Sequence, residues 1–360
     1  MSLRLSLELV ICALMSLAES RSAIAATPIT PEDFQARTFD DGAGHVLPYR
    51  LYVPRGVDPT RKVPLVLFLH GAGGRGTDNL HQLTDQAAPL VFVQPANQAR
   101  WPVVMVAPQC PVDQQWVALP WAAPSGKGQR PPLPTWPLAA AVALVDRLVA
   151  EFPAVDAANL YVTGMSMGGF GAFDAAARYP GKWRAVVPIC GGYDEDQVAA
   201  LVGVPLWAFH AEDDPAVPVA RTRDVIAALR ARGGHPRYTE YPASAGHGHF
   251  SWNPAYGNPE LLPWMFGPHP SPPAKSTEAP SAMRPSPAPT VKAPGRGRGC
   301  ACALALPVGT KGGSAPRHVP SHGDDQGQGT DQDPHSVAAS LAVLATIAAY
   351  VGRRRPRNTA

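Results

Sequence analysis

A serine set between two glycines is the feature that most constrains this chain. Ser166 lies in Gly164-Met165-Ser166-Met167-Gly168, shortly after the apolar run Leu160-Tyr161-Val162. A stretch with helical spacing follows, from Met167 to Tyr179. This order predicts a strand, a sharp turn and a helix, with the serine hydroxyl exposed on the turn as a candidate nucleophile.

Other apolar runs, rich in β-branched residues, predict buried parallel strands. They cover residues 63–69, 103–107, 160–162, 185–189 and 205–209, with a last strand over 238–241. Helical spacing predicts helices over residues 137–152, 167–179 and 219–232, and alternation over residues 34–53 predicts an antiparallel edge strand or hairpin. Strands that alternate with helices imply an α/β fold with a mainly parallel sheet flanked by helices.

Residues 110–136 form the one long loop of this pattern. The loop is rich in proline and contains Trp116, Trp121 and Trp136. We expect it to wall one side of the site, with at least two of the three tryptophans in ordinary core packing. We expect no separate lid domain.

Composition divides the chain into a folded domain and a tail. Of its 42 prolines, 13 lie in residues 268–334, a stretch poor in large apolar side chains. Such a stretch buries too little surface to fold, so we predict a folded domain over residues 30–267 and a disordered linker over 268–335. Residues 1–267 contain 20 Lys/Arg and 23 Asp/Glu. The folded part is therefore not basic, and we expect no nucleic-acid partner.

Both ends carry targeting features. Arg4, an apolar run over residues 5–17 and small residues at 22–26 predict a signal peptide over residues 1–26, with a buried N-terminal helix as the alternative. We therefore expect a secreted, periplasmic or cell-surface protein. Residues 336–352 are uncharged and mostly apolar, and a basic tail follows over 353–360. They predict membrane anchoring through a short span, or else a tail helix without membrane function.

The cysteines give a weaker indication. Cys110 and Cys190 each end a predicted strand, while Cys300 and Cys302 lie in the tail. An oxidising compartment permits disulfides. Two strand ends in one sheet need not be close, so we expect Cys110 and Cys190 to be buried free thiols.

A serine nucleophile requires a base within hydrogen-bond reach and a carboxylate that orients the base. Asp213 and Asp214 follow the predicted strand 205–209, and His247 and His249 follow the strand 238–241. The order serine, acid, histidine is the one that α/β-hydrolases use. Position along the chain leaves both acids and both histidines open.

Three blocks of sequence resemble a known family. They are Leu69–Asn79 with His70-Gly71-Ala72-Gly73-Gly74, then Gly164–Gly171 with Arg178-Tyr179-Pro180, and then Phe209-His210 through Asp214–Pro218 to Gly246-His247. In this order they resemble secreted or periplasmic α/β-hydrolase esterases of the predicted-peptidase, feruloyl-esterase and polyhydroxybutyrate-depolymerase-like group. The resemblance covers residues 35–267 and implies the α/β-hydrolase fold.

The resemblance assigns roles to the candidates. It implies that Ser166 is the nucleophile, His247 the general base and Asp214 the orienting acid. Asp213 and His249 remain the rivals, because a shift of one or two residues in either loop would exchange them.

The same resemblance implies the oxyanion hole. The oxyanion hole would combine the backbone N–H groups of Met167 and Ala72. Trp116 and Trp252 are the candidates for the substrate pocket. No metal and no cofactor is expected, since the remaining histidines lack ligand spacing.

The predicted activity is hydrolysis of carboxylic esters through an acyl-enzyme, on small-molecule or polysaccharide-linked substrates. One alternative is a peptidase of the prolyl-oligopeptidase type, although the sequence has no propeller domain. A second is a non-catalytic, surface-anchored binding module with a degenerate hydrolase fold. The substrate and the oligomeric state stay open.

Overall fold

The computed structural model describes residues 27–56, 60–86 and 88–269. The predicted signal peptide, the membrane span over 336–352, the basic tail and the cysteines Cys300 and Cys302 lie outside these residues, as does all but the start of the linker. Among the described residues, no helix has the length and apolar character needed to cross a bilayer.

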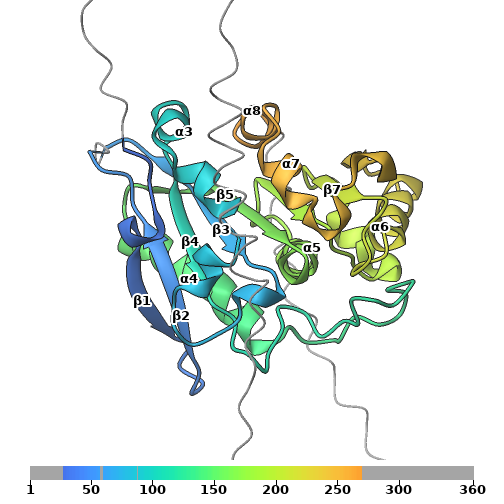
Figure 1. The fold of residues 1–360 in the computed structure, drawn as a ribbon. Helices are drawn as coiled ribbons and strands as arrows, with labels where there is room; N and C mark the ends of the chain where they lie inside the picture. Colours follow the sequence, from blue (N-terminus) through green and yellow to red (C-terminus); the bar gives the residue numbers. More distant parts are fainter. Residues whose placement is uncertain (1–26, 57–59, 87, 270–360) are drawn as a thin grey trace, which may run out of the picture. The chain divides into compact units, whose positions relative to one another are not determined.

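The described residues build one eight-stranded sheet in the order β1-β2-β4-β3-β5-β6-β7-β8 (Figure 1). Strands β1 and β2 form an antiparallel hairpin at one edge, β2 is antiparallel to β4, and the remaining pairs are parallel. This confirms the predicted α/β fold with its N-terminal hairpin. The strands are β1 (Gln35–Asp40), β2 (Val46–Tyr52), β3 (Val63–Leu69), β4 (Val104–Pro108), β5 (Val155–Met165), β6 (Ala185–Ile189), β7 (Trp207–Ala211) and β8 (Arg237–Tyr241).

Helices connect and cover the strands. They are α2 (His81–Thr84), α3 (Pro95–Arg100), α4 (Trp136–Glu151), α5 (Met167–Arg178), α6 (Ala220–Ala231), α7 (Trp252–Tyr256) and α8 (Leu261–Met265), and short 3-10 helices fill several loops. The three predicted helices correspond to α4, α5 and α6. Helix α4 carries Pro137 in its first turn and ends at Glu151, just before Phe152 and Pro153. Proline is tolerated at a helix start and stops a helix from continuing, which explains both boundaries.

Side chains alternate between the two faces of the sheet. On β3, Leu65, Leu67 and Leu69 join the core beneath α4, α5 and α6. Val66 and Phe68 point to the opposite face and join the core beneath α7 and α8. Both faces of β3 are therefore buried, which explains its uninterrupted apolar sequence.

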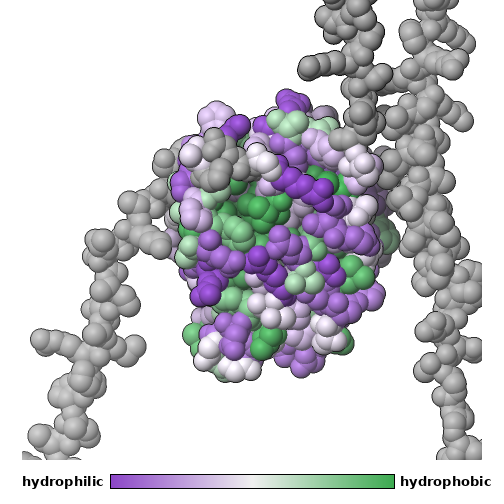
Figure 2. Space-filling model, turned by 90° about the vertical axis from the view of Figure 1, so that its left-hand side faces the viewer, coloured by the Kyte–Doolittle hydropathy of each residue, from purple (hydrophilic) through white to green (hydrophobic). Residues whose placement is uncertain are grey.

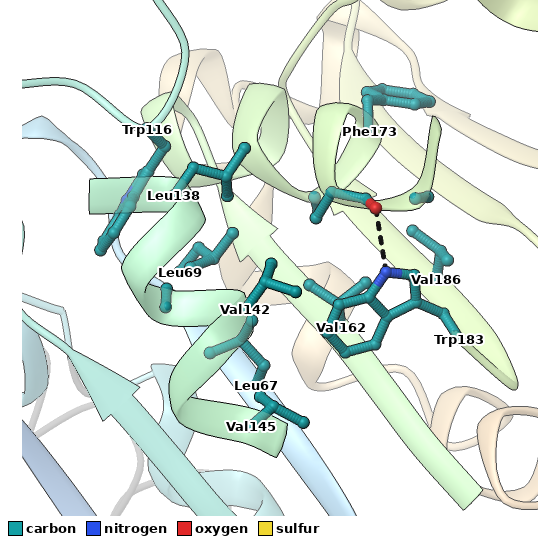
Figure 3. Close-up of a cluster of buried hydrophobic side chains, with 14 of the residues drawn as sticks. Leu67, Leu69, Trp116, Leu138, Val142, Val145, Val162, Phe173, Trp183 and Val186 are labelled. Atoms are coloured by element: carbon teal, nitrogen blue, oxygen red, sulfur yellow. Dashed lines mark hydrogen bonds between the residues drawn. The ribbon is translucent and has the colours of Figure 1, made fainter. Parts of the chain in front are cut away.

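The core under α4 is shown in Figure 3. Leu138, Val142 and Val145 of α4 lie over strand residues that include Leu67 and Val162. The indole N–H of Trp183 donates to the carbonyl of Ala175 at 3.0 Å, which satisfies a buried polar group beside α5. Full burial of a leucine or valine side chain in this core stabilises the fold by about 1.5–3 kcal/mol relative to its exposure to water. This packing fixes α5, and with it the residue that precedes α5.

The long loop before α4 is anchored to α5. Asp174 is fully buried and accepts hydrogen bonds from Arg130 at 3.0 Å and from Arg178 at 2.6 Å. Arg178 also donates to the carbonyls of Pro131 and Pro132. The loop is therefore held against the helix by paired buried charges, and removing one partner of such a pair is costly.

Figure 2 shows one face of the domain, on which polar residues predominate around a hydrophobic patch. The large apolar side chains that the described residues expose are Val46, Val112, Leu133 and Phe250. Cys110 and Cys190 are buried free thiols, as predicted. Burial raises the pKa of Cys110 to about 12, so its thiol stays protonated near neutral pH.

Candidate active site

Ser166 occupies a strained turn between β5 and α5. Its φ is 54° and its ψ −122°, a region that residues other than glycine rarely adopt. A Cβ atom on Gly168 would lie 1.8 Å from the carbonyl oxygen of Leu69, and one on Gly164 would lie 2.3 Å from the carbonyl oxygen of Gly168. Both glycines are therefore needed for the close approach of α5 to the strands. The result is a serine held at the first turn of α5, with 8% of its surface exposed.

His249 links Ser166 to a carboxylate. Its Nε2 lies 2.9 Å from Ser166 Oγ. Its Nδ1 lies 2.8 Å from Asp214 Oδ2 and 3.0 Å from Oδ1. An ionised carboxylate only accepts, so Nδ1 carries the proton and Nε2 is left to accept from the serine hydroxyl. This is the arrangement in which a histidine can act as a general base on a serine.

The position of His247 corrects the expectation from the sequence. Its ring packs edge-on against Tyr241 at 5.1 Å, and within the described residues no hydrogen bond joins it to Ser166 or Asp214. Gly246 and Gly248 both have left-handed backbones, with φ values of 64° and 52°. These two turns bring the later histidine over the serine. The structure therefore assigns to His249 the position that the resemblance implied for His247.

Asp214, the acid that the resemblance implied, is held by its own loop. Its Oδ1 accepts from the backbone N–H groups of Ala216 and Val217, each at 2.9 Å. Burial raises the pKa of Asp214, but hydrogen bonds from His210, His249 and the Val217 N–H outweigh that effect and lower the pKa below its ordinary value. The carboxyl group is therefore ionised at neutral pH.

The rival acid, Asp213, faces elsewhere. Its Oδ1 is buried, with no hydrogen-bond partner in the part of the chain that the structure describes. Among the described residues, the hydrogen bonds of His249 to a carboxylate are all to Asp214. The structure brings Asp214, and not Asp213, to the histidine.

Two backbone N–H groups lie beside the serine. Met167 is the first residue of α5, where an N–H has no acceptor within the helix and lies at the positive end of the helix dipole. Ala72 begins a 3-10 turn directly after Gly71, and a Cβ atom on Gly71 would lie 3.7 Å from Ser166 Cβ. The glycine loop therefore runs along the serine, which is where a second oxyanion donor is needed.

His70 supports that loop from below. Its Nδ1 donates to the carbonyl of Gly71 at 2.6 Å, and its Nε2 accepts from the N–H of Cys110 at 2.9 Å. Complete burial lowers the pKa of His70 to about 4. His70 is therefore a neutral structural side chain near neutral pH.

Of the two tryptophans expected at the pocket, one is buried in the core. Trp116 is 0% exposed, and its indole N–H donates to the carbonyl of His70 at 3.0 Å. It packs against the ring of His70 beneath the glycine loop, and it is too deeply buried to line an open pocket. Trp252 does adjoin the site, since its ring lies edge-on to His249 at 5.2 Å.

Phe250 is a neighbour of the site that sequence reasoning missed. It is 54% exposed and packs edge-on against Trp252 at 5.1 Å. Its position directly after the candidate histidine His249 was the available signal.

One group of side chains in the described residues has donor atoms close enough to hold a metal ion. Cys190, Asp214 and His249 offer atoms within 4.8 Å of one another. Asp214 and His249 already bind each other, however, and burial raises the pKa of Cys190, which disfavours the thiolate that a metal requires. Cys190 Sγ instead accepts the N–H of Ser166 at 3.3 Å. The arrangement suits serine chemistry better than metal binding.

Comparisons with known proteins agree with the α/β fold. Residues 138–260 match the Dienelactone hydrolase family. A thermostable esterase of known crystal structure is 42% identical, with a TM-score of 0.60 over 65% of this chain. The matched region spans 63% of the length of that esterase.

A structure of an acylaminoacyl peptidase in complex with Z-Gly-Gly-Phe-chloromethyl ketone also matches. Its identity is 13% and its TM-score 0.40, over 58% of this chain and 36% of the peptidase. Curated proteins gave no significant match. Sheet topology, the matched family and the esterase neighbour together show that the chain has an α/β-hydrolase fold.

Proposed function

We propose that the protein hydrolyses carboxylic esters, with Ser166 as nucleophile, His249 as general base and Asp214 as the acid that orients His249. The observation that carries this proposal is the 2.9 Å contact between His249 Nε2 and Ser166 Oγ. It supplies the base within hydrogen-bond reach that an otherwise weak hydroxyl nucleophile needs.

Acylation begins when Ser166 Oγ attacks the ester carbonyl carbon and its proton passes to His249 Nε2. The carbonyl oxygen becomes an oxyanion, which the N–H groups of Met167 and Ala72 stabilise. One such donor is worth about 3 kcal/mol of the barrier. Asp214 stabilises the imidazolium that forms on His249. The intermediate then collapses, the ester C–O bond breaks, and the leaving alcohol takes the proton from Nε2.

Deacylation repeats these steps with water. His249 Nε2 removes a proton from the water as its oxygen attacks the acyl carbon. Collapse of the second intermediate breaks the bond to Ser166 Oγ, which recovers a proton from Nε2, and the carboxylic acid is released. The 21% exposure of the His249 side chain gives this water and the substrate a route to the histidine.

The substrates that we propose are small-molecule or polysaccharide-linked esters. Support comes from the partly exposed side chain of His249 and from the exposed apolar ring of Phe250, the next residue in the chain. A panel of esters that varies acyl length and includes hydroxycinnamates distinguishes the acyl groups. Equal rates on matched peptide amides would instead favour a peptidase.

We also propose that the protein acts outside the cytoplasm, since residues 1–26 have the composition of a signal peptide. Mass spectrometry of the N-terminus of the mature protein tests this. The expected mature chain lacks Arg4, and a mature chain that retains Arg4 would contradict export by cleavage.

The test of the activity compares Ser166→Ala with Ser244→Ala on a short-chain p-nitrophenyl ester. Ser244 is an exposed serine in the loop after β8 and serves as the matched control. Ser166→Ala should lower kcat/KM by about 10³-fold or more, and Ser244→Ala should not change it. A Ser166→Ala protein with full activity would refute the proposal.

A further inference from the structure

A second histidine, besides His249, contacts Asp214. His210 lies on β7, four residues before Asp214, and its side chain is fully buried. Its Nε2 lies 3.1 Å from Asp214 Oδ2 and 3.0 Å from the carbonyl oxygen of Val217. Its Nδ1 lies 2.7 Å from Thr222 Oγ1.

The partners of the ring require a proton on each nitrogen. Thr222 Oγ1 lies 2.7 Å from the carbonyl oxygen of Gly191, and since a carbonyl only accepts, the single hydroxyl proton of Thr222 is directed there. Thr222 must therefore accept from His210, so Nδ1 carries a proton. At Nε2 both partners, a carbonyl and an ionised carboxylate, are acceptors, so Nε2 carries a proton as well.

We infer that His210 is a buried imidazolium that positions Asp214 for its partnership with His249. This inference rests on the proposed function, in which Asp214 orients the general base. His210 touches neither substrate nor the reacting atoms, and it acts through Asp214 alone.

The surrounding charges are consistent with a cation at this position. Asp214 faces the ring from the loop after β7, and Glu240, whose carboxylate is bound by Arg223, lies opposite His210 in the register of β8. From α6 the ring meets the neutral hydroxyl of Thr222. Beside Asp214, at the end of β6, burial raises the pKa of Cys190, which is therefore an uncharged thiol. A buried charge is tolerated when it is paired and hydrogen-bonded, and here every ring proton has an acceptor.

The contacts of Asp214 explain what the cation does. The N–H groups of Ala216 and Val217 bind Oδ1, and His210 binds Oδ2. These three donors hold the carboxylate in place while His249 Nδ1 contacts both of its oxygens. Without His210, Oδ2 keeps only its contact with His249, and a small misplacement of a catalytic group can cost about 10²-fold in rate.

The protonation state is tested by ¹⁵N NMR of the histidine side chains in the full-length protein at about pH 7, where an ordinary histidine is mostly neutral. The His210 signals are assigned by their loss in His210→Gln. Both ring nitrogens should carry a bonded proton. One unprotonated ring nitrogen would overturn the inference.

Kinetics test the positioning role. His210→Phe should lower kcat about 10²-fold with little change in KM, because binding does not involve Asp214. His210→Gln can place an amide N–H near the Nε2 position and should recover part of that loss. Unchanged kcat in His210→Phe would overturn the role.

Thr222 provides a second pair of variants in case His210→Phe does not fold. Thr222→Ser keeps the acceptor for Nδ1–H and should retain kcat, whereas Thr222→Val removes it and should lower kcat. Equal kcat values in these two variants would also count against the inference. Activity in Ser166→Ala would refute the proposed function while leaving the NMR result intact, so the two failures are distinguishable.

Discussion

His249 and Asp214, 35 residues apart in the chain, meet through one ring nitrogen and both oxygens of the carboxylate. Because the Nδ1–H group of His249 donates to both carboxylate oxygens, the contact fixes the tilt of the imidazole ring as well as its distance from Asp214. His249 therefore presents its other nitrogen to Ser166 in a single orientation, which is the condition for general-base catalysis.

The two histidines of the loop after β8 should differ sharply in their importance. His249→Ala removes the base and should lower kcat/KM by at least about 10³-fold. His247→Ala removes only an edge-on contact with Tyr241 and should keep kcat/KM within about threefold. Steady-state assays of both variants on one ester check this, and the reverse order would reinstate His247 as the base.

The two neighbouring aspartates form a second matched pair. Asp214→Asn cannot hold the Nδ1–H form of His249 in place, so kcat should fall about 10⁴-fold. Asp213→Asn leaves the contacts of His249 untouched and should retain kcat within about threefold. Comparable losses in both variants would show that the orienting acid is misassigned.

The strands were predictable because burial leaves a direct signature in sequence. The predicted strand 63–69 coincides with β3, whose two buried faces require a continuous apolar run. On β7 the prediction ended at Phe209, whereas the strand continues through His210 to Ala211. An apolar pattern cannot register a buried histidine whose polar atoms are satisfied by Thr222 and Asp214.

The choice of histidine was less predictable. The loop after β8 contains Gly246-His247 and Gly248-His249, two identical dipeptides in succession. Only the path of the backbone through the left-handed glycines decides which ring reaches Ser166. The pocket role predicted for Trp116 was wrong for a related reason. A tryptophan in a loop gives the same sequence pattern whether it lines a pocket or fills the core.

Gly168, two residues after Ser166, should be indispensable for folding. In Gly168→Ala the added methyl would overlap the carbonyl oxygen of Leu69, and neither backbone can move without disturbing β3 or α5. We expect a loss of about 3 kcal/mol or more in the free energy of unfolding. Gly71→Ala, whose methyl meets only ordinary contacts, should change it by less than about 1 kcal/mol. Urea unfolding measures both, and equal stabilities would contradict the tight approach.

His70 should make stability depend on pH in mild acid. Its pKa is about 4 in the folded protein against 6.5 ordinarily, so below pH 6.5 the unfolded chain binds a proton that the folded chain does not. The free energy of unfolding should therefore fall as the pH drops from 6.5 to 4, by about 3 kcal/mol from this residue.

Urea unfolding across that pH range, with His70→Gln and His235→Gln as a pair, isolates the contribution. His70→Gln should show a shallower decline than the parent protein. His235 is exposed, and its replacement should leave the pH dependence unchanged. Parallel curves for the parent and His70→Gln would contradict the role given to burial.

The most direct test of the central claim is to label the folded protein with a fluorophosphonate and map the adduct by mass spectrometry. Such a reagent reacts with a serine whose hydroxyl is activated by a base. We predict one adduct, on Ser166, formed at the same rate in His247→Ala and far more slowly in His249→Ala. Folded protein that forms no adduct on Ser166, or that labels equally well without His249, would contradict it.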